Sequence, residues 1–166
     1  MSSSNQRKIL YEEKWMPKWV PLVLYLPCFY TYGIQIEKYI DGDGDGDYDG
    51  ANLPQKSLNI NNERTILTFG YGLRGPGGWT AHEVKLCDIK PNTIVSGNAT
   101  WKDNLFRFGG WGIRVGKGHN EGKITWAYIA SNGGFIEFED VKGTCYRFGT
   151  RDADTVFNIL NQTETS

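Results

Sequence analysis

The chain has 166 residues and a formal net charge of -1 at pH 7, with 21 glycines against six prolines. This length can bury the core of one ordinary domain with an appendage, and the glycine excess favours many tight β-connections over a helical bundle. The near-zero charge excludes a molecule-wide field that would attract nucleic acid, so we expect no nucleic-acid partner.

An uncharged stretch dominates the N-terminal quarter of the chain. Residues 19–36, WVPLVLYLPCFYTYGIQI, contain no charged side chain. As a helix they would extend about 27 Å, close to the ~30 Å hydrocarbon core of a bilayer. Aromatic residues near both ends are typical of membrane-spanning helices. The pattern predicts a membrane anchor, and its expected residues are Trp15, Lys18, Trp19, Leu22, Leu24, Leu26, Phe29 and Tyr32.

Three interpretations of this stretch are open. It is a single spanning helix, an interfacial or re-entrant segment broken at Pro27, or a helix packed on the folded domain. Residues 1–36 carry a net charge of +2, whereas residues 37–63 carry -5. The positive-inside rule then predicts a cytoplasmic N-terminus and an extracytoplasmic main domain. We expect a single-pass or monotopic protein of the cell membrane, with membrane lipid as one of its partners.

Residues 41–50, DGDGDGDYDG, resemble a calcium-binding loop in their spacing. Alternate aspartates can supply oxygen ligands, Gly46 allows a sharp reversal, and calcium is the expected cofactor. The expected metal site comprises Asp41, Asp43, Asp45, Asp47 and Asp49. Asn52 replaces the bidentate glutamate of an EF-hand, and Pro54 forbids an immediate exit helix. A solvated, self-repelling linker is the alternative.

The remainder of the chain predicts short strands and one helix. Strands are expected over residues 64–71, 81–87 and 93–96, followed by a loop over 97–104 that includes Trp101. Further strands are expected over 123–130, 135–139 and 144–148, because β-branched and aromatic residues are enriched or alternate there. Asp152 is expected to cap a final helix, whose apolar residues recur at helical spacing through Leu160.

The second half of the chain resembles a known family in pattern. GGWGIR at 109–114, AYI at 127–129, the glycine pair at 133–134, FGTR at 148–151 and NIL at 158–160 follow in order. This order resembles the prokaryotic pleckstrin-homology-like domains of membrane-associated proteins of unknown function, over roughly residues 64–161. The resemblance implies a mainly β (α+β) fold, a seven-stranded split β-barrel with a C-terminal capping helix.

The expected organisation has three parts. Residues 1–39 form a tail and the apolar membrane or interfacial helix, residues 40–62 form the acidic linker, and residues 63–166 form the pleckstrin-homology-like barrel. Cys87 and Cys145 are expected to be buried thiols, with a disulfide between them as the alternative.

No catalytic motif is present in the sequence, and neither His82 nor His119 belongs to one. We therefore expect a protein that is not an enzyme. Aromatic and arginine side chains are common anchors of protein interfaces. The expected partner-binding residues are Trp101, Trp111, Arg114 and Trp126, with Arg114 stacked on an aromatic ring.

These patterns support three functional hypotheses. The first is a membrane-anchored, protein-binding module that serves as an accessory or structural subunit of a larger membrane complex. The second is a peripheral domain that binds anionic lipid, because basic residues lie among the aromatic ones. The third is a calcium-dependent extracytoplasmic surface module.

Overall fold

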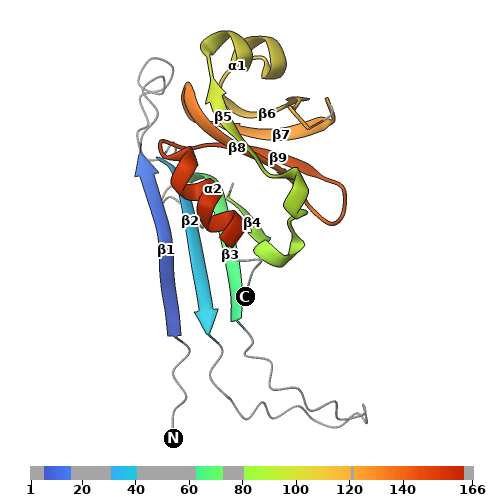
Figure 1. Cartoon of the computed structure of the whole chain (residues 1–166). Helices are drawn as coiled ribbons and strands as arrows, with labels where there is room; N and C mark the ends of the chain where they lie inside the picture. The colour runs from blue at the N-terminus through green and yellow to red at the C-terminus, as the bar shows by residue number, and fades with distance from the viewer. Residues whose placement is uncertain (1–5, 16–30, 41–62, 73–80, 121, 163–166) are drawn as a thin grey trace, which may run out of the picture.

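The computed structural model describes residues 6–15, 31–40, 63–72, 81–120 and 122–162. The described part of the chain is mainly β, with two sheets and a C-terminal helix (Figure 1). Its strands are β1 (Gln6–Trp15), β2 (Thr31–Ile40), β3 (Glu63–Gly72), β4 (His82–Lys85), β5 (Val95–Ala99), β6 (Gly112–Lys117), β7 (Ile124–Ile129), β8 (Gly133–Glu139) and β9 (Cys145–Gly149). Its helices are the short 3-10 helices η3 (Leu86–Asp88) and η4 (Pro91–Thr93) and the α-helices α1 (Trp101–Phe108) and α2 (Ala153–Gln162).

The first sheet is antiparallel, in the order β1-β2-β3-β4. Strands β2 and β3 pair along their full ten residues, from Thr31 opposite Gly72 to Ile40 opposite Glu63. Alternate residues of a strand face opposite sides of a sheet. Tyr32, Ile34 and Ile36 therefore share one side, and each is fully buried. This side of the sheet forms half of the core.

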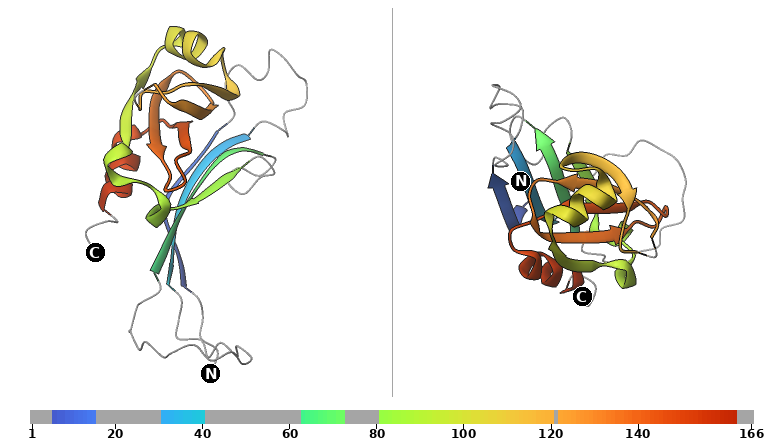
Figure 2. Two further views of the ribbon diagram at one scale, coloured as in Figure 1. Left: turned by 90° about the vertical axis from the view of Figure 1, so that its right-hand side faces the viewer. Right: turned by 90° about the horizontal axis from the view of Figure 1, so that it is seen from above.

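The second sheet has the order β5-β8-β9-β7-β6, in which only the β7–β9 pairing is parallel. Its inner side contributes Phe138 and Phe148, which contact Phe69 of the first sheet at ring-centroid distances of 6.1 and 4.9 Å. Helix α2 lies against β5 and β8, and its Val156 and Leu160 enter the same core. The core thus lies between the two sheets and α2, as the views in Figure 2 show.

The N-terminal strand is tied to the end of β9 by polar contacts. The Glu13 carboxylate accepts a hydrogen bond from Thr150 Oγ1 at 2.8 Å and from the Arg151 amide at 3.0 Å. The Arg151 guanidinium lies 4.8 Å above the ring of Trp15. These contacts join residues more than 130 positions apart in the chain, so they fix how the two sheets meet.

The helix expected over residues 19–36 is wrong for residues 31–36, the part of this stretch that the structure describes. Residues 31–36 belong to β2, because Tyr32, Ile34 and Ile36 alternate with more polar residues at the period of a strand. The expected anchor residues Trp15 and Tyr32 lie in the core, with ring centroids 4.6 Å apart. Neither α1 nor α2, the two α-helices of the described residues, has the length and apolar character needed to cross a bilayer. Lys18, Trp19, Leu22, Leu24, Leu26 and Phe29 lie outside the described residues.

Other expectations also need correction. The described strands form two sheets rather than a closed barrel, and the first sheet crosses the boundary expected at residue 63 because β1 and β2 join β3. The loop expected over residues 97–104 contains the end of β5 and the start of α1. The helix that begins after Asp152 is confirmed, and Asp152 Oδ1 accepts a hydrogen bond from the Thr155 amide at 3.0 Å.

Candidate functional site: exposed apolar surfaces around the β6–β7 ribbon

One side of the antiparallel β6–β7 ribbon is largely apolar, and it is exposed toward the end where β6 connects to β7. Val115 lies opposite Trp126 in the register, and Lys117 lies opposite Ile124. The alternation of strands places Val115, Ile124 and Trp126 on the same side of the ribbon. Their exposed fractions are 50%, 72% and 46%. We call these three residues the ribbon surface.

The opposite side of the ribbon is covered by helix α1. Ala127 and Ile129 are buried there against Phe108, with Trp111 packed beside them. The helix approaches so closely that a Cβ on Gly116 would lie 2.0 Å from the carbonyl oxygen of Arg107. Only glycine fits at this contact, so α1 is held directly on the ribbon.

Helix α1 is defined by its caps. The Thr100 side chain and the Asp103 backbone and side chain form a capping box, and Gly109 ends the helix with a φ of +72°. Asn104 and Phe108 face inward and are buried, whereas Trp101, Leu105 and Phe106 are 51%, 43% and 80% exposed. We call these three exposed residues the helix surface. Helix α1 lies at the opposite end of the molecule from the Gln6, Ile40 and Glu63 ends of β1–β3 (Figure 1).

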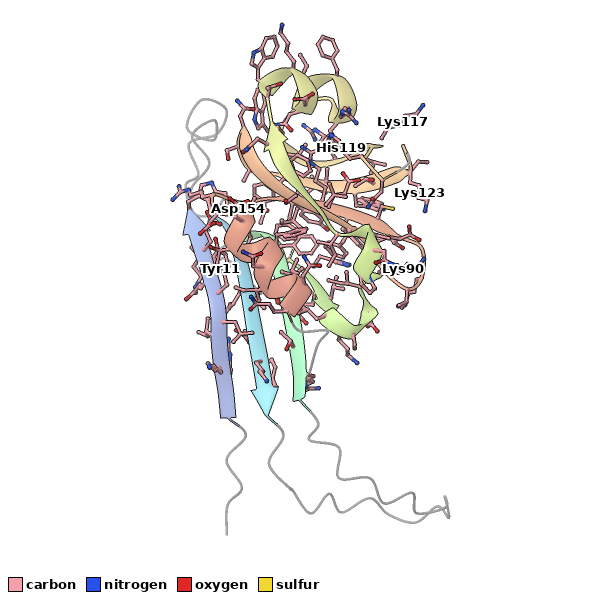
Figure 3. All side chains as sticks on the ribbon, in the orientation of Figure 1. Tyr11, Lys90, Lys117, His119, Lys123 and Asp154 are labelled. Atoms are coloured by element: carbon pink, nitrogen blue, oxygen red, sulfur yellow. The ribbon has the colours of Figure 1, made fainter. Side chains whose placement is uncertain are left out.

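Six of the eight large exposed apolar side chains in the described residues belong to these two surfaces, and the others are Ile9 and Val141. Single exposed apolar residues are normal, but a cluster of them marks an interaction site. The surrounding charge is mainly positive, because residues 101–126 contain five Lys or Arg and two Asp or Glu. Lys117 and Lys123 lie at the outer end of the ribbon in Figure 3.

The expected partner-binding residues lie on both sides of the ribbon. Trp126 belongs to the ribbon surface and Trp101 to the helix surface, whereas Trp111 is partly buried in the small cluster beneath α1. Arg114 is exposed on the α1 side of β6, since it lies opposite Ala127. The expected stacking of Arg114 is not seen among the described residues; its Nη1 donates to the Ile113 carbonyl at 3.2 Å.

The arginine that does stack is Arg147, which is 1% exposed. Its guanidinium carbon lies 3.6 Å from the ring centroid of Phe135 and 5.0 Å from that of Phe108. Burial is the main cause that lowers the pKa of Arg147 from its ordinary value to about 10. The Nη1 atom is 3.3 Å from His119 Nδ1. Among the described residues, Arg147 Nη2 has no hydrogen-bond partner.

A buried carboxylate lies beside this arginine. Glu137 is directly opposite Arg147 in the β8–β9 register and is fully buried. Its Oε1 accepts the Asn120 amide at 2.8 Å, and its Oε2 lies 3.7 Å from His119 Nδ1. Oε2 has no hydrogen-bond partner within the described residues. Sequence analysis missed this cluster, because the alternation of β8 shows which side Glu137 faces but not that α1 and the β6–β7 connection cover that side.

A shallow pocket of about 310 Å³ lies where β4 meets the turn between β8 and β9. His82 stacks on Tyr146 in its wall, with ring centroids 4.4 Å apart, and burial lowers the pKa of His82. The Asp140 carboxylate beside it accepts the amides of Lys142 and Thr144 at 2.9 and 2.8 Å. These bonds are those of a turn-stabilising aspartate.

The metal and cysteine expectations have different outcomes. Asp41, Asp43, Asp45, Asp47 and Asp49 lie outside the described residues, and the described residues contain no group of three His, Cys, Asp or Glu side chains that could hold a metal. Cys87 and Cys145 are both free thiols. Cys145 is buried as expected, whereas Cys87 is exposed.

No protein-family model, curated protein or solved structure matches the chain. The function must therefore be argued from the geometry of the described residues. In that geometry the exposed apolar surfaces, rather than a cleft with reactive groups, are the features that call for a functional explanation.

Proposed function

We propose that the chain is a non-catalytic binding module that docks a protein partner through the ribbon surface, and that it serves as an accessory subunit of a larger complex. The observation that carries the proposal is the exposure of Val115, Ile124 and Trp126 side by side on a paired, hydrogen-bonded ribbon. Regular backbone pairing holds the three side chains in fixed positions, which lowers the entropy lost on binding.

The chemistry of the ribbon surface suits a protein partner. Tryptophan is enriched among the residues that dominate binding energy, and aliphatic neighbours exclude water around it. Lys117 lies at the margin of the same side, opposite Ile124, where charged residues guide orientation rather than supply most of the affinity. The partner surface is expected to be apolar at its centre and acidic at its margin, because the margin of the ribbon is basic.

The test is partner retention by the full chain. The tagged protein is isolated in mild detergent from the cells that make it, and stoichiometric partners are quantified for each variant. Trp126→Ser and Val115→Ser are each expected to lower retention at least about tenfold, since truncating a central interface residue costs about 2 kcal/mol or more. Val141→Ser is the matched control, because Val141 is 55% exposed but lies in the β8–β9 turn.

The proposal fails if the wild-type chain is isolated as a monomer without a partner, or if the Val115 and Val141 variants retain a partner equally. Trp101→Ser separates the two surfaces, since Trp101 lies on α1 rather than on the ribbon. It is expected to leave protein docking unchanged.

A second candidate function is favoured by the helix surface. Trp101, Leu105 and Phe106 are exposed on α1, which lies at one end of the molecule (Figure 1), and Lys102 and Arg107 of the same helix are also exposed. Aromatic and basic side chains on one helix are typical of binding at a membrane surface that contains anionic lipid. Sedimentation with phosphatidylcholine vesicles, with and without phosphatidylserine, tests this role. Phe106→Ser should abolish phosphatidylserine-dependent binding, and binding unchanged in that variant would exclude it.

The remaining expectations stay proposals. The succession of short strands followed by a packed C-terminal helix is compatible with a pleckstrin-homology-like domain, but the likeness is one of pattern. We also propose attachment to the cell membrane, an extracytoplasmic position of the main domain, and calcium binding by residues 41–49, which lie outside the described residues. A topology assay on intact cells and thermal shifts with millimolar calcium test them.

A further inference from the structure

Strand β6 is an edge strand of the second sheet. In the order β5-β8-β9-β7-β6 it pairs with β7 on one side, and no strand of the described residues pairs with its other side. None of its six residues is buried, and Arg114, Val115 and Lys117 are exposed. A Cβ on Gly116 would meet the Arg107 carbonyl. Because the Cβ atoms of a strand point out of the sheet plane, α1 covers a face of β6 rather than its hydrogen-bonding edge.

The outward-facing backbone groups of β6 follow from its hydrogen-bond register. In an antiparallel pair, the N–H and C=O groups of alternate residues point toward the neighbouring strand, and those of the residues between them point away. The Gly118 amide donates to the Lys123 carbonyl at 3.0 Å, one register position beyond the Lys117–Ile124 pair. Counted back in steps of two, the even-numbered residues of β6 face β7. The residues that face away are Ile113, Val115 and Lys117.

A second contact agrees with this assignment. The Ile113 carbonyl accepts a hydrogen bond from Arg114 Nη1 at 3.2 Å, as a carbonyl turned away from β7 can. The outward N–H and C=O groups of Val115 and Lys117 have no hydrogen-bond partner in the part of the chain that the structure describes. Unpaired backbone groups on an exposed edge are a template for a further strand. The edge of β6 can therefore accept an extended segment from another chain.

We propose that the protein partner supplies an extended, acidic segment that pairs antiparallel with the outer edge of β6 and adds a sixth strand to the five-stranded sheet. This inference rests on the proposed docking function and names the class of its partner. In this binding mode, main-chain hydrogen bonds with Val115 and Lys117 supply affinity, and side chains at alternate positions supply specificity.

The side chains of β6 define the sequence that the segment needs. A residue opposite Val115 would lie about 4.8 Å beyond it, in the row that Val115 forms with Trp126, and should be apolar. A residue opposite Lys117, on the same side of the sheet, should be acidic. A residue opposite Arg114, on the α1 side, should be acidic for the same reason. In antiparallel register the segment therefore reads acidic, any residue, apolar, acidic from its N-terminal end.

Charge argues against a second copy of the chain as the occupant of this edge. Strand β6 carries Arg114 and Lys117 and no acidic residue, so two paired copies of β6 would bring together charges of one sign only. Charged side chains on an edge strand are a common protection against self-pairing. Opposite charge on a different partner turns the same two residues into favourable contacts.

The first test is hydrogen exchange of the full chain by NMR, with the peptide SDTIETS as the probe and SKTIKTS as the control of opposite charge. In the free chain the Val115 and Lys117 amides should exchange rapidly, whereas the Gly116 amide, which faces β7, should be protected. About 10 mM SDTIETS is roughly ten times the dissociation constant of a weak, millimolar site, so exchange at Val115 and Lys117 should slow about tenfold. Exchange at Gly116 should not change, and SKTIKTS should have no effect.

Four outcomes of this measurement overturn the inference. Slow exchange of Val115 in the dilute free chain would show that the edge is already covered. Slowing that appears only as the protein concentration rises would assign the edge to a second copy. Equal effects of the two peptides would remove the acidic partner class, and no slowing with SDTIETS would remove strand pairing itself.

Two variants of Val115 separate strand pairing from docking by side chains alone. Val115→Ala keeps the amide and loses apolar carbon, whereas Val115→Pro keeps apolar carbon and loses the outward amide. Edge strands tolerate proline where the missing N–H faces away from the sheet. In the partner-retention assay, strand pairing predicts at least about tenfold lower retention for Val115→Pro than for Val115→Ala.

Equal or better retention by Val115→Pro overturns strand pairing and leaves docking through the ribbon surface intact. The exchange measurement uses only the wild-type chain, so it decides the inference should Val115→Pro not fold. If the wild type retains no partner, the docking function fails, and the peptide titration still reports on the edge of β6. The two proposals therefore fail separately.

Discussion

Replacing Ile34 with alanine tests whether the N-terminal half of the chain belongs to the core. Ile34 is fully buried in the middle of β2, opposite Phe69 of β3. The substitution removes three carbons, or about 2.4 kcal/mol at roughly 0.8 kcal/mol per buried methylene. A residual cavity raises the expected loss in the free energy of unfolding to about 3–4 kcal/mol. Ile9→Ala is the matched control in the adjacent strand, because Ile9 is 49% exposed.

Urea unfolding followed by tryptophan fluorescence measures both losses, and the control is expected to cost about 1 kcal/mol or less. The chain should remain folded, since a loss of this size is smaller than the stability of an ordinary domain. A loss below about 1 kcal/mol for Ile34→Ala, or equal losses for the two variants, would refute the placement of β2 in the core.

Three further predictions use the same unfolding assay. The free energy of unfolding should fall as the pH drops below about 6.5. The pKa values of His82 and His119 are lowered in the folded state, so the unfolded chain takes up more protons in this range. A free energy of unfolding that rises on acidification would contradict this sign. Asp152→Ala should cost about 0.5–2 kcal/mol because Asp152 caps α2; Asp154→Ala, two residues further along the chain and exposed, should cost less. Gly118→Ala should cost about 1–3 kcal/mol, because its Cβ would lie 2.2 Å from Thr125 Oγ1 and 2.4 Å from Glu137 Oε1; wild-type stability in that variant would show that the β6–β7 connection is not packed against these two side chains.

The strands and the last helix of the second half could be predicted from local signals. Strands β3, β7, β8 and β9 follow runs of β-branched or alternating residues, and α2 follows a capping aspartate. Helix α1 was missed although its signals are in the sequence: Thr100 and Asp103 have the spacing of a capping box, and Gly109 follows six residues after Asp103.

Strand β2 was misread because hydropathy and periodicity disagree there. Residues 31–36 continue an uncharged run, which favours a membrane helix, yet Tyr32, Ile34 and Ile36 alternate with Gly33 and Gln35 at the period of a strand. The buried cluster of Glu137, Arg147 and His119 could not be predicted, because the β8–β9 register places Glu137 opposite Arg147 and the β6–β7 connection then brings His119 against both from a distant part of the chain. Of the surface residues, Trp101 and Trp126 were identified from composition alone, but their separation onto two sides of the ribbon needed the register.

The central structural claim is that β2 lies beneath the second sheet, where the Tyr32 hydroxyl donates to the Gly149 carbonyl at 2.8 Å. Nuclear Overhauser contacts in aqueous buffer test it most directly. Cross-peaks between the Tyr32 ring and the backbone protons of Gly149 are the predicted result. Helical contacts between residues three apart over 31–36, without any cross-peak to β9, would contradict the account.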